Sequence, residues 1–204
     1  GIGLAIAQAL AARADIRVLA AARSMRIADE AARRIGAGAA GVALDLSDPQ
    51  AAEARAVEIE ARHGPVDILV NNAGVRPDGD ALSADLREFN TAMRVNAAAP
   101  YALTRIFGAG MKRRGWGRVV NVSSGAGSFG EGLDGPAAYA ISKAALNAVT
   151  VQFARALGPA VKVKACSPGQ VRTRMGSPEA DRNAAAGEDT PFGPLVAADN
   201  LVGL

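Results

Sequence analysis

Cysteine and histidine are almost absent from this chain of 204 residues, which has one of each, Cys166 and His63. A single cysteine excludes an intrachain disulfide. A single histidine argues against a Ser–His–Asp hydrolase triad and against a metal site built on histidines. His63 also belongs to an Arg-His-Gly-Pro segment that is typical of a helix end. We therefore expect no metal site.

Aromatic residues and charge of one sign are also scarce. Aromatic residues are 4% of the chain, so the core is expected to consist of Val, Ile, Leu and closely packed Ala. The formal net charge of +3 is small, and the one dense basic stretch, Lys112-Arg113-Arg114 with Arg118, is too short to argue for nucleic acid. We interpret this stretch as a solvated helix end and expect no nucleic-acid partner.

Long apolar runs are missing as well. None approaches the roughly 20 residues of a membrane span, and nothing resembles a signal peptide. We therefore expect a cytoplasmic protein without a membrane partner. The length of 204 residues fits one domain with a sizeable core.

Short apolar runs instead alternate with amphipathic, helix-like runs. The expected strands are 16–21, 41–44, 66–70, 118–122 and 161–165, and the expected helices lie near 3–12, 24–35, 49–62, 83–112 and 136–157. This alternation predicts an α/β fold, a three-layer doubly wound parallel sheet of the Rossmann type with helices on both faces. Ligands bind such a sheet at the carboxyl ends of its strands, near the topological switch point.

A glycine-containing turn, Gly1-Ile2-Gly3, opens the chain directly before an apolar helical run. Glycines there would let the backbone approach a pyrophosphate, and the helix N-terminus would favour its negative charge. Taken alone, these residues are better explained as a glycine-rich tail. The tetrapeptide Asn71-Asn72-Ala73-Gly74 reverses that judgement, because it follows the strand 66–70 directly and suits a turn where the backbone comes close to a ligand.

This Asn-Asn-Ala-Gly motif is specific to the short-chain dehydrogenases/reductases, and the chain resembles that family over nearly all of 1–175. The resemblance implies that Asn71 braces the central strands and that the backbone of Ala73 and Gly74 lies along the adenosine ribose. It also implies that Asp45, in Leu44-Asp45-Leu46, hydrogen-bonds the adenine amino group. Asp45 can alternatively be a helix cap, although Asp48 before Pro49 is better placed for that role.

The end of the second strand of the family's sheet indicates which cofactor is preferred. An acidic residue at this point would bind the ribose 2′-hydroxyl of NAD. This chain has Ala21-Ala22-Arg23-Ser24 instead, so no carboxylate repels a 2′-phosphate. Arg23 can pair with such a phosphate, helped by the Ser24 hydroxyl. We favour NADP(H) over NAD(H), which stays possible.

Tyr139 and Lys143 are spaced i, i+4, which on a helix puts both side chains on one face, one turn apart. Pro136 suits the first turn of such a helix, and Gly158-Pro159 suits its end. A nearby ammonium lowers the pKa of a phenol, which can then donate a proton to a developing alkoxide. Lys143 can also hydrogen-bond the nicotinamide ribose. A surface Tyr–Lys pair is the alternative.

Ser123 and Ser124 follow the strand 118–122, where the sheet argument places the active site. A serine hydroxyl there can hydrogen-bond a substrate carbonyl and its oxyanion. The resemblance implies that Ser124 is the catalytic serine, with Gly127 in the family's following glycine position, and Ser123 is the alternative. It further implies that the backbone carbonyl of Asn96 holds a water that connects the lysine to solvent. Asn96 is otherwise a mid-helix Asn satisfied by its own backbone.

The segment Pro168-Gly169-Gln170-Val171-Arg172-Thr173 matches the family's Pro-Gly-x-Val-x-Thr element. This match implies that the Val171 backbone and the Thr173 hydroxyl contact the nicotinamide amide, and that Cys166 is a buried structural thiol. Residues 171–176 and 187–190 further resemble the carbonyl-reductase-like branch, which reduces aldehydes and ketones with NADPH.

Together these features predict an oxidoreductase that transfers a hydride between NADP(H) and a small carbonyl or alcohol substrate. The alternatives are a non-catalytic nucleotide-binding relic and an NAD-dependent alcohol dehydrogenase of the same family. Small residues on the helix 136–157 predict a homodimer or homotetramer, because family members commonly associate through this helix and the one before it.

The chain begins at Gly1 rather than Met and ends at Leu204. We interpret it as one NAD(P)-binding Rossmann-type domain, 1–204, that is truncated at both ends. The strand that normally enters the Gly1–Gly3 turn would then lie upstream. We expect the fragment alone to be poorly stable, because two neighbouring strands lose a partner.

Overall fold

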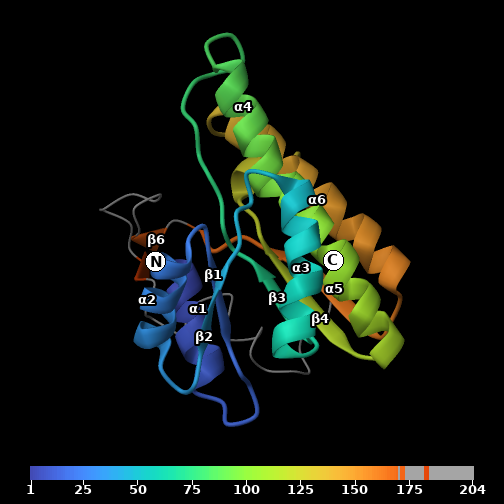
Figure 1. Cartoon of the computed structure of the whole chain (residues 1–204). Coiled ribbons are helices and arrows are strands. Elements are labelled where there is room, and N and C mark those ends of the chain that lie inside the picture. The colour runs from blue at the N-terminus through green and yellow to red at the C-terminus, as the bar shows by residue number, and fades with distance from the viewer. Residues whose placement is uncertain (170, 173–181, 184–204) are drawn as a thin grey trace. The chain divides into compact units, whose positions relative to one another are not determined.

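The computed structural model describes residues 1–169, 171–172 and 182–183 (Figure 1). The chain divides into two compact units. One comprises Gly1–Asp45 together with the described part of Pro168–Leu204, and the other comprises Leu46–Ser167. Each unit has its own parallel strands.

Helices and strands alternate in the first unit. Its elements are α1 (Ile2–Ala11), β1 (Leu19–Ala22), α2 (Met25–Ile35) and β2 (Ala40–Ala43). β1 and β2 are parallel, with Leu19 opposite Ala40, and α2 makes the crossover between them. Gly41 lets α2 pack closely on β2, because a Cβ at this position would lie 2.7 Å from the Ala28 backbone. Two further short strands, β6 (Val171–Arg172) and β7 (Arg182–Asn183), pair in parallel.

The second unit is a three-stranded parallel sheet with helices. The strands β3 (Ile68–Asn71), β4 (Gly117–Val122) and β5 (Val161–Cys166) lie in the order β3-β4-β5. Three helices, α3 (Pro49–His63), α5 (Ala99–Arg114) and α6 (Ala137–Leu157), lie side by side, with α5 in contact with the other two (Figure 1). Buried Val119, Val161 and Val163 form the middle of this core.

The helix expected at 83–112 is present, but it is not regular throughout. It begins as α4 (Leu86–Met93), passes through a π-helical turn, η1 (Arg94–Ala98), and continues as α5. Asp85 caps its start by accepting from the backbone N–H groups of Arg87 and Glu88. Single π turns inside α-helices are frequent at functional sites, and this one contains Asn96.

Local sequence signals explain the start of α3 and both ends of α6. Asp48 caps α3 by accepting from the N–H groups of Gln50 and Ala51, so the cap expected from the sequence is the observed one. α6 begins after Pro136 and ends at Gly158, whose φ of 70° suits glycine. The other expected strands and helices are also present, with boundaries displaced by a few residues.

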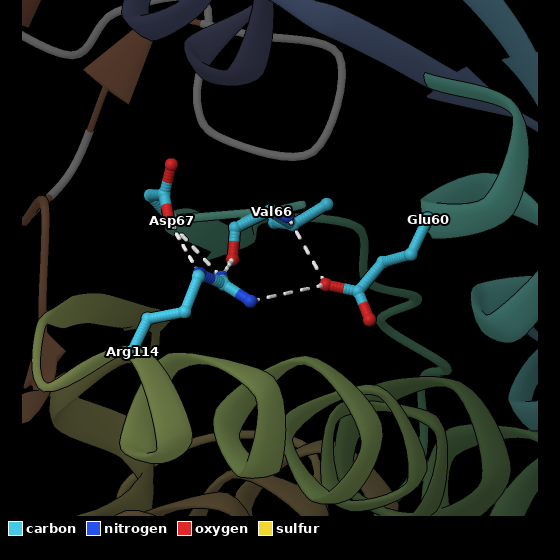
Figure 2. A network of polar contacts seen from close by, with 4 residues as sticks. All are labelled: Glu60, Val66, Asp67 and Arg114. Atoms are coloured by element: carbon cyan, nitrogen blue, oxygen red, sulfur yellow. Dashed lines mark hydrogen bonds and ion pairs between the residues drawn. The ribbon is translucent and has the colours of Figure 1, made fainter. Parts of the chain in front are cut away.

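Lys112, Arg113 and Arg114 are exposed, as expected of a solvated helix end, and Arg114 also makes polar contacts that the sequence did not predict. Its guanidinium hydrogen-bonds Asp67 Oδ1 at 2.9 and 3.1 Å and the Val66 carbonyl at 2.7 Å (Figure 2). Glu60 Oε1 lies 3.9 Å from the same guanidinium and accepts from the Val66 N–H at 3.1 Å. This network joins the end of α5 to the end of α3 and to the segment that enters β3.

Among the described residues, β1 pairs only with β2, and β3 pairs only with β4. The described strands therefore form three separate parallel sheets, β1-β2, β3-β4-β5 and β6-β7, where the sequence predicts one sheet. In that part of the chain, no helix is both long and apolar enough to cross a membrane.

Candidate active site

A row of buried amides joins the strands at their carboxyl ends in the second unit. Asn71, the last residue of β3, donates from Nδ2 to Asn121 Oδ1 at 2.7 Å. Asn121 on β4 in turn donates to Thr150 Oγ1 on α6 at 2.8 Å. Such paired buried amides make the strand ends rigid. The contact is the one that a bracing role for Asn71 requires.

Tyr139 and Lys143 lie on α6 beside this row. Lys143 Nζ is 5.7 Å from the centroid of the Tyr139 ring and donates to the Val122 carbonyl at 2.7 Å. Both side chains are buried. No described residue hydrogen-bonds the Tyr139 hydroxyl, so this group is available to a ligand.

Burial sets the titration of two groups at this edge of the sheet. It lowers the pKa of Lys143 to about 8, because a buried ammonium loses its hydration, and a smaller effect from Cys166 opposes the change. Burial also raises the pKa of the Cys166 thiol to about 11. The thiol therefore stays protonated at neutral pH and is a poor nucleophile.

The two serines after β4 have different surroundings. Ser123 is buried, and its hydroxyl donates to Asn147 Oδ1 at 2.7 Å. Ser124 is half-buried, and its Oγ accepts only a long hydrogen bond, 3.3 Å, from the Ala126 N–H. The Ser124 proton has no acceptor among the described residues, so Ser124 is the serine whose hydroxyl can donate to a substrate oxygen.

Asn147 is a site residue that the sequence analysis missed. Besides accepting from Ser123, it donates to the Gly127 carbonyl at 3.0 Å. It thereby ties α6 to η2 (Gly125–Gly127), the short 3-10 turn that follows Ser124. The signal for it was its position four residues after Lys143, which continues the face of α6 that carries Tyr139.

Asn96 is fully buried, and its side-chain amide is completely engaged. Its Oδ1 accepts from the Val75 N–H at 2.8 Å, and its Nδ2 donates to the Val75 carbonyl at 2.8 Å and to Ser142 Oγ at 2.9 Å. The alternative of an Asn satisfied by its own helix is therefore wrong. The side chain instead holds the segment that follows Gly74.

Gly74 brings the backbone of the Asn-Asn-Ala-Gly motif into the same site. A Cβ at Gly74 would lie 3.2 Å from Asn96 Oδ1 and 3.6 Å from Lys143 Nζ. Asn71, Gly74, Asn96, Tyr139 and Lys143, which are far apart in the sequence, are thus brought together. Ala73, the other residue expected to contact the ribose, is exposed.

The residues expected at the nucleotide lie mainly in the first unit. Gly1 precedes α1, which has no side-chain cap, so its first N–H groups can bind an anion. Arg23 and Ser24 are exposed at the end of β1, and neither side chain has a partner among the described residues. Asp45 follows β2 and is exposed, whereas Leu46 is half-buried at the start of the second unit.

Part of the expected nicotinamide-binding element can be located. Pro168 is buried, Gly169 has a φ of 69°, and Val171 belongs to β6. Thr173 and the residues matched to the carbonyl-reductase-like branch, apart from 171–172, lie outside the described residues. Where the chain is described, no group of His, Cys, Asp and Glu side chains could hold a metal ion.

Comparison with known proteins identifies the family. The model of the short chain dehydrogenase family matches residues 1–184. The chain is 34% identical over 176 residues to the 3-oxoacyl-[acyl-carrier-protein] reductase FabG of Escherichia coli (strain K12), covering 86% of this chain and 71% of that protein. It is 37% identical over 177 residues to a galactitol 2-dehydrogenase (L-tagatose-forming) of Cereibacter sphaeroides, covering 86% and 69%.

Solved structures with a similar fold support the same family. One is a gluconate 5-dehydrogenase from Burkholderia cenocepacia J2315 in complex with NADP and tartrate, with a TM-score of 0.78 and 28% identity, covering 92% of this chain and 74% of that one. Another is a metagenomic short-chain oxidoreductase in complex with NADP, with a TM-score of 0.70 and 34% identity, covering 84% and 78%. The expected Rossmann-type fold is confirmed, and the chain belongs to the short-chain dehydrogenase/reductase family.

Proposed function

We propose that this protein transfers a hydride between NADP(H) and a carbonyl or alcohol substrate, with Tyr139 as the acid or base. The observation that carries the proposal is the Tyr139 hydroxyl, which no described residue hydrogen-bonds, beside the buried Lys143 at the carboxyl end of β4. Gly74 supports the same assignment, because a residue without a Cβ lets the loop backbone lie close to Lys143.

In the direction of reduction, a bound nicotinamide would supply the hydride to the carbonyl carbon. Tyr139 donates its proton to the oxygen as negative charge develops there, and the Ser124 hydroxyl stabilises that charge by a hydrogen bond. The Lys143 ammonium favours the phenolate that remains. The side-chain amide of Asn96 is fully engaged, so its backbone carbonyl is the group left to hold a relay water near Lys143.

NADP(H) is the cofactor that the end of β1 favours. Arg23 can pair with a 2′-phosphate and Ser24 can donate a hydrogen bond to it, and both side chains are exposed. Ala22 carries no charge that would repel the phosphate. Two of the similar solved structures contain NADP.

The named relatives suggest the breadth of the substrate class. Their names refer to 3-oxoacyl groups on a carrier protein, to galactitol and to gluconate. All three reactions interconvert a carbonyl and a secondary alcohol. Neither curated relative described above is named a carbonyl reductase, so membership of that branch stays a prediction.

The test is NADPH oxidation with a panel of aldehydes and ketones, with Tyr139→Phe beside wild type. The variant loses the proton donor, so we expect its kcat to fall below about a tenth of wild type while NADPH binding, followed by fluorescence, is kept. Tyr101→Phe is the matched control, because Tyr101 packs on Phe153 with ring centroids 5.1 Å apart. Tyr139→Phe with more than a tenth of wild-type kcat removes Tyr139 from this role.

We also propose that the protein is a homodimer or homotetramer formed through α5 and α6. Tyr101, Ile141 and Val151 are 49%, 44% and 39% exposed on these helices, and the small exposed Ala148 permits close helix approach. Light scattering at tens of micromolar tests this assembly. We expect Ala148→Arg to reduce the mass to that of one chain, and a monomeric wild type would contradict the proposal.

A further inference from the structure

A second cation, Arg76, lies over the Tyr139 ring. Its Cζ is 5.9 Å from the ring centroid, within the range of a cation–π contact. Ring and hydroxyl are one rigid group, so the guanidinium lies only a few atoms' length from the hydroxyl that we assign to proton transfer. Unlike the buried Lys143, the Arg76 side chain is 43% exposed and therefore accessible to a ligand.

No described residue accepts a hydrogen bond from the Arg76 guanidinium. Its nearest acidic partner is Asp78, at 3.8 Å, which is beyond hydrogen-bonding distance, and the Asp78 side chain is 93% exposed. An exposed ion pair of this kind is weak and is screened by salt. No other hydrogen bond or ion pair of the guanidinium is found where the structure describes the chain. Five N–H donors in a planar fork are thus left for a ligand.

The backbone that carries Arg76 is fixed in place. The preceding residue, Val75, is held through both its N–H and its carbonyl by the buried Asn96 amide, each at 2.8 Å. Asn96 is itself tied to Ser142 on α6, three residues after Tyr139. Arg76 and Tyr139 are therefore positioned by one hydrogen-bonded unit, and such preorganisation favours ligand binding.

We propose that Arg76 binds the carboxylate of the substrate, so that this protein prefers short oxo acids, or the corresponding hydroxy acids, to their neutral esters. The inference rests on the proposed role of Tyr139. The guanidinium fork matches a carboxylate with two parallel hydrogen bonds. A carboxylate that is one to three carbons from the carbonyl would reach Arg76 while the carbonyl oxygen lies at the Tyr139 hydroxyl.

The test compares 2-oxobutanoate, 3-oxobutanoate and 4-oxopentanoate with their methyl esters, using the full chain and NADPH. For the best acid we expect wild-type kcat/KM to exceed that of its ester by about tenfold or more. Arg76→Gln should lose about ten- to a hundredfold on that acid, as loss of a charged hydrogen bond implies, and less than about threefold on the ester. Arg76→Lys, which keeps the charge without the fork, should lie between.

Arg113→Gln is the matched control, because it removes the same charge from an exposed position at the end of α5. Equal loss on acid and ester in Arg76→Gln would overturn the inference, since it would show that Arg76 only packs on Tyr139. An ester preference in wild type would do the same.

A binding measurement separates this inference from the proposed function. Butanoate, which cannot be reduced, should bind wild type by calorimetry and bind Arg76→Gln at least about tenfold more weakly. If no acid or ester is turned over but butanoate binds through Arg76, the catalytic proposal fails and the carboxylate site stands. If wild type reduces esters but does not bind butanoate, the carboxylate site fails alone.

Discussion

Asn96 and the backbone of Val75 share two hydrogen bonds of 2.8 Å: the Val75 N–H donates to Asn96 Oδ1, and Asn96 Nδ2 donates to the Val75 carbonyl. A buried amide can do this because it carries both a donor and an acceptor. The π-helical turn that contains Asn96 thereby holds the loop after Gly74 in place.

Asn96→Asp is therefore expected to be destabilising, because a carboxylate cannot donate to the Val75 carbonyl or to Ser142. Two lost donations at a fully buried position should lower the free energy of unfolding by about 2–5 kcal/mol. Asn90→Asp, the same change at an exposed position on α4, should stay within about 0.5 kcal/mol of wild type. Urea denaturation measures the stability of both variants. If Asn96→Asp were as stable as wild type, the hydrogen bonds between Asn96 and Val75 would contribute little.

Gly127 permits η2 to contact α6, and its substitution should disturb the site. A Cβ there would lie 2.6 Å from the Lys143 carbonyl carbon and 2.8 Å from the Ala144 nitrogen, which are backbone atoms that cannot move aside easily. We expect Gly127→Ala to lose about 1–3 kcal/mol of stability and more than about tenfold in kcat.

Gly130→Ala is the control in the same loop, because its Cβ would meet only Ser128 Oγ, at 3.7 Å. It should behave like wild type in thermal denaturation and in kcat. If Gly127→Ala were equally silent, the close packing of η2 on α6 would not matter for the site.

Substitution of the two serines, Ser123 and Ser124, should have clearly different effects on kcat. Ser124→Ala removes the hydroxyl assigned to the substrate oxygen, so kcat should fall by about a hundred- to a thousandfold. Ser123→Ala removes a hydrogen bond to Asn147 and should cost about 1 kcal/mol of stability with a smaller effect on kcat. Steady-state kinetics and urea denaturation on both variants decide this, and the reverse ranking would assign catalysis to Ser123.

The pH dependence of reduction should reflect the burial of Lys143. Burial lowers its pKa to about 8, so the ammonium that supports Tyr139 loses its charge as the pH rises through that value. We expect kcat for reduction to be level below pH 8 and to fall by up to about tenfold per pH unit above it. Rates at saturating NADPH in one mixed buffer measure the profile, and a profile that is flat to pH 10 would contradict the assignment.

Cofactor preference should depend on the end of β1. Ala22→Asp places a carboxylate where a 2′-phosphate would bind, so the ratio of kcat/KM for NADPH to that for NADH should fall by about ten- to a hundredfold. Arg23→Gln should weaken NADPH alone. Arg26→Gln, which removes an exposed charge paired with Glu30 at 3.8 Å, is the control. A wild type that prefers NADH would show that Arg23 does not select the cofactor.

Features that depend on neighbouring residues could be predicted from the sequence. Three local patterns lie where they were expected: the i, i+4 pair of Tyr139 and Lys143 on one helix, the cap at Asp48, and the Asn71–Gly74 motif at the end of a strand. Hydrophobic periodicity likewise located the strands and helices, because it follows from the geometry of one element at a time.

Contacts between distant segments were decided only by the tertiary structure. Arg114 is exposed at a helix end, as the sequence predicts, but its hydrogen bonds to Asp67 and Val66 form because α5 ends beside the segment that enters β3. Asn147 likewise depends on the packing of η2 on α6, and Arg76 depends on the hydrogen bonds that hold Val75 to Asn96. The sequence by itself determines the charge, the hydrogen-bond donors and the spacing of these residues. Their partners lie 20 or more positions away in the chain, and only folding brings them within hydrogen-bonding distance.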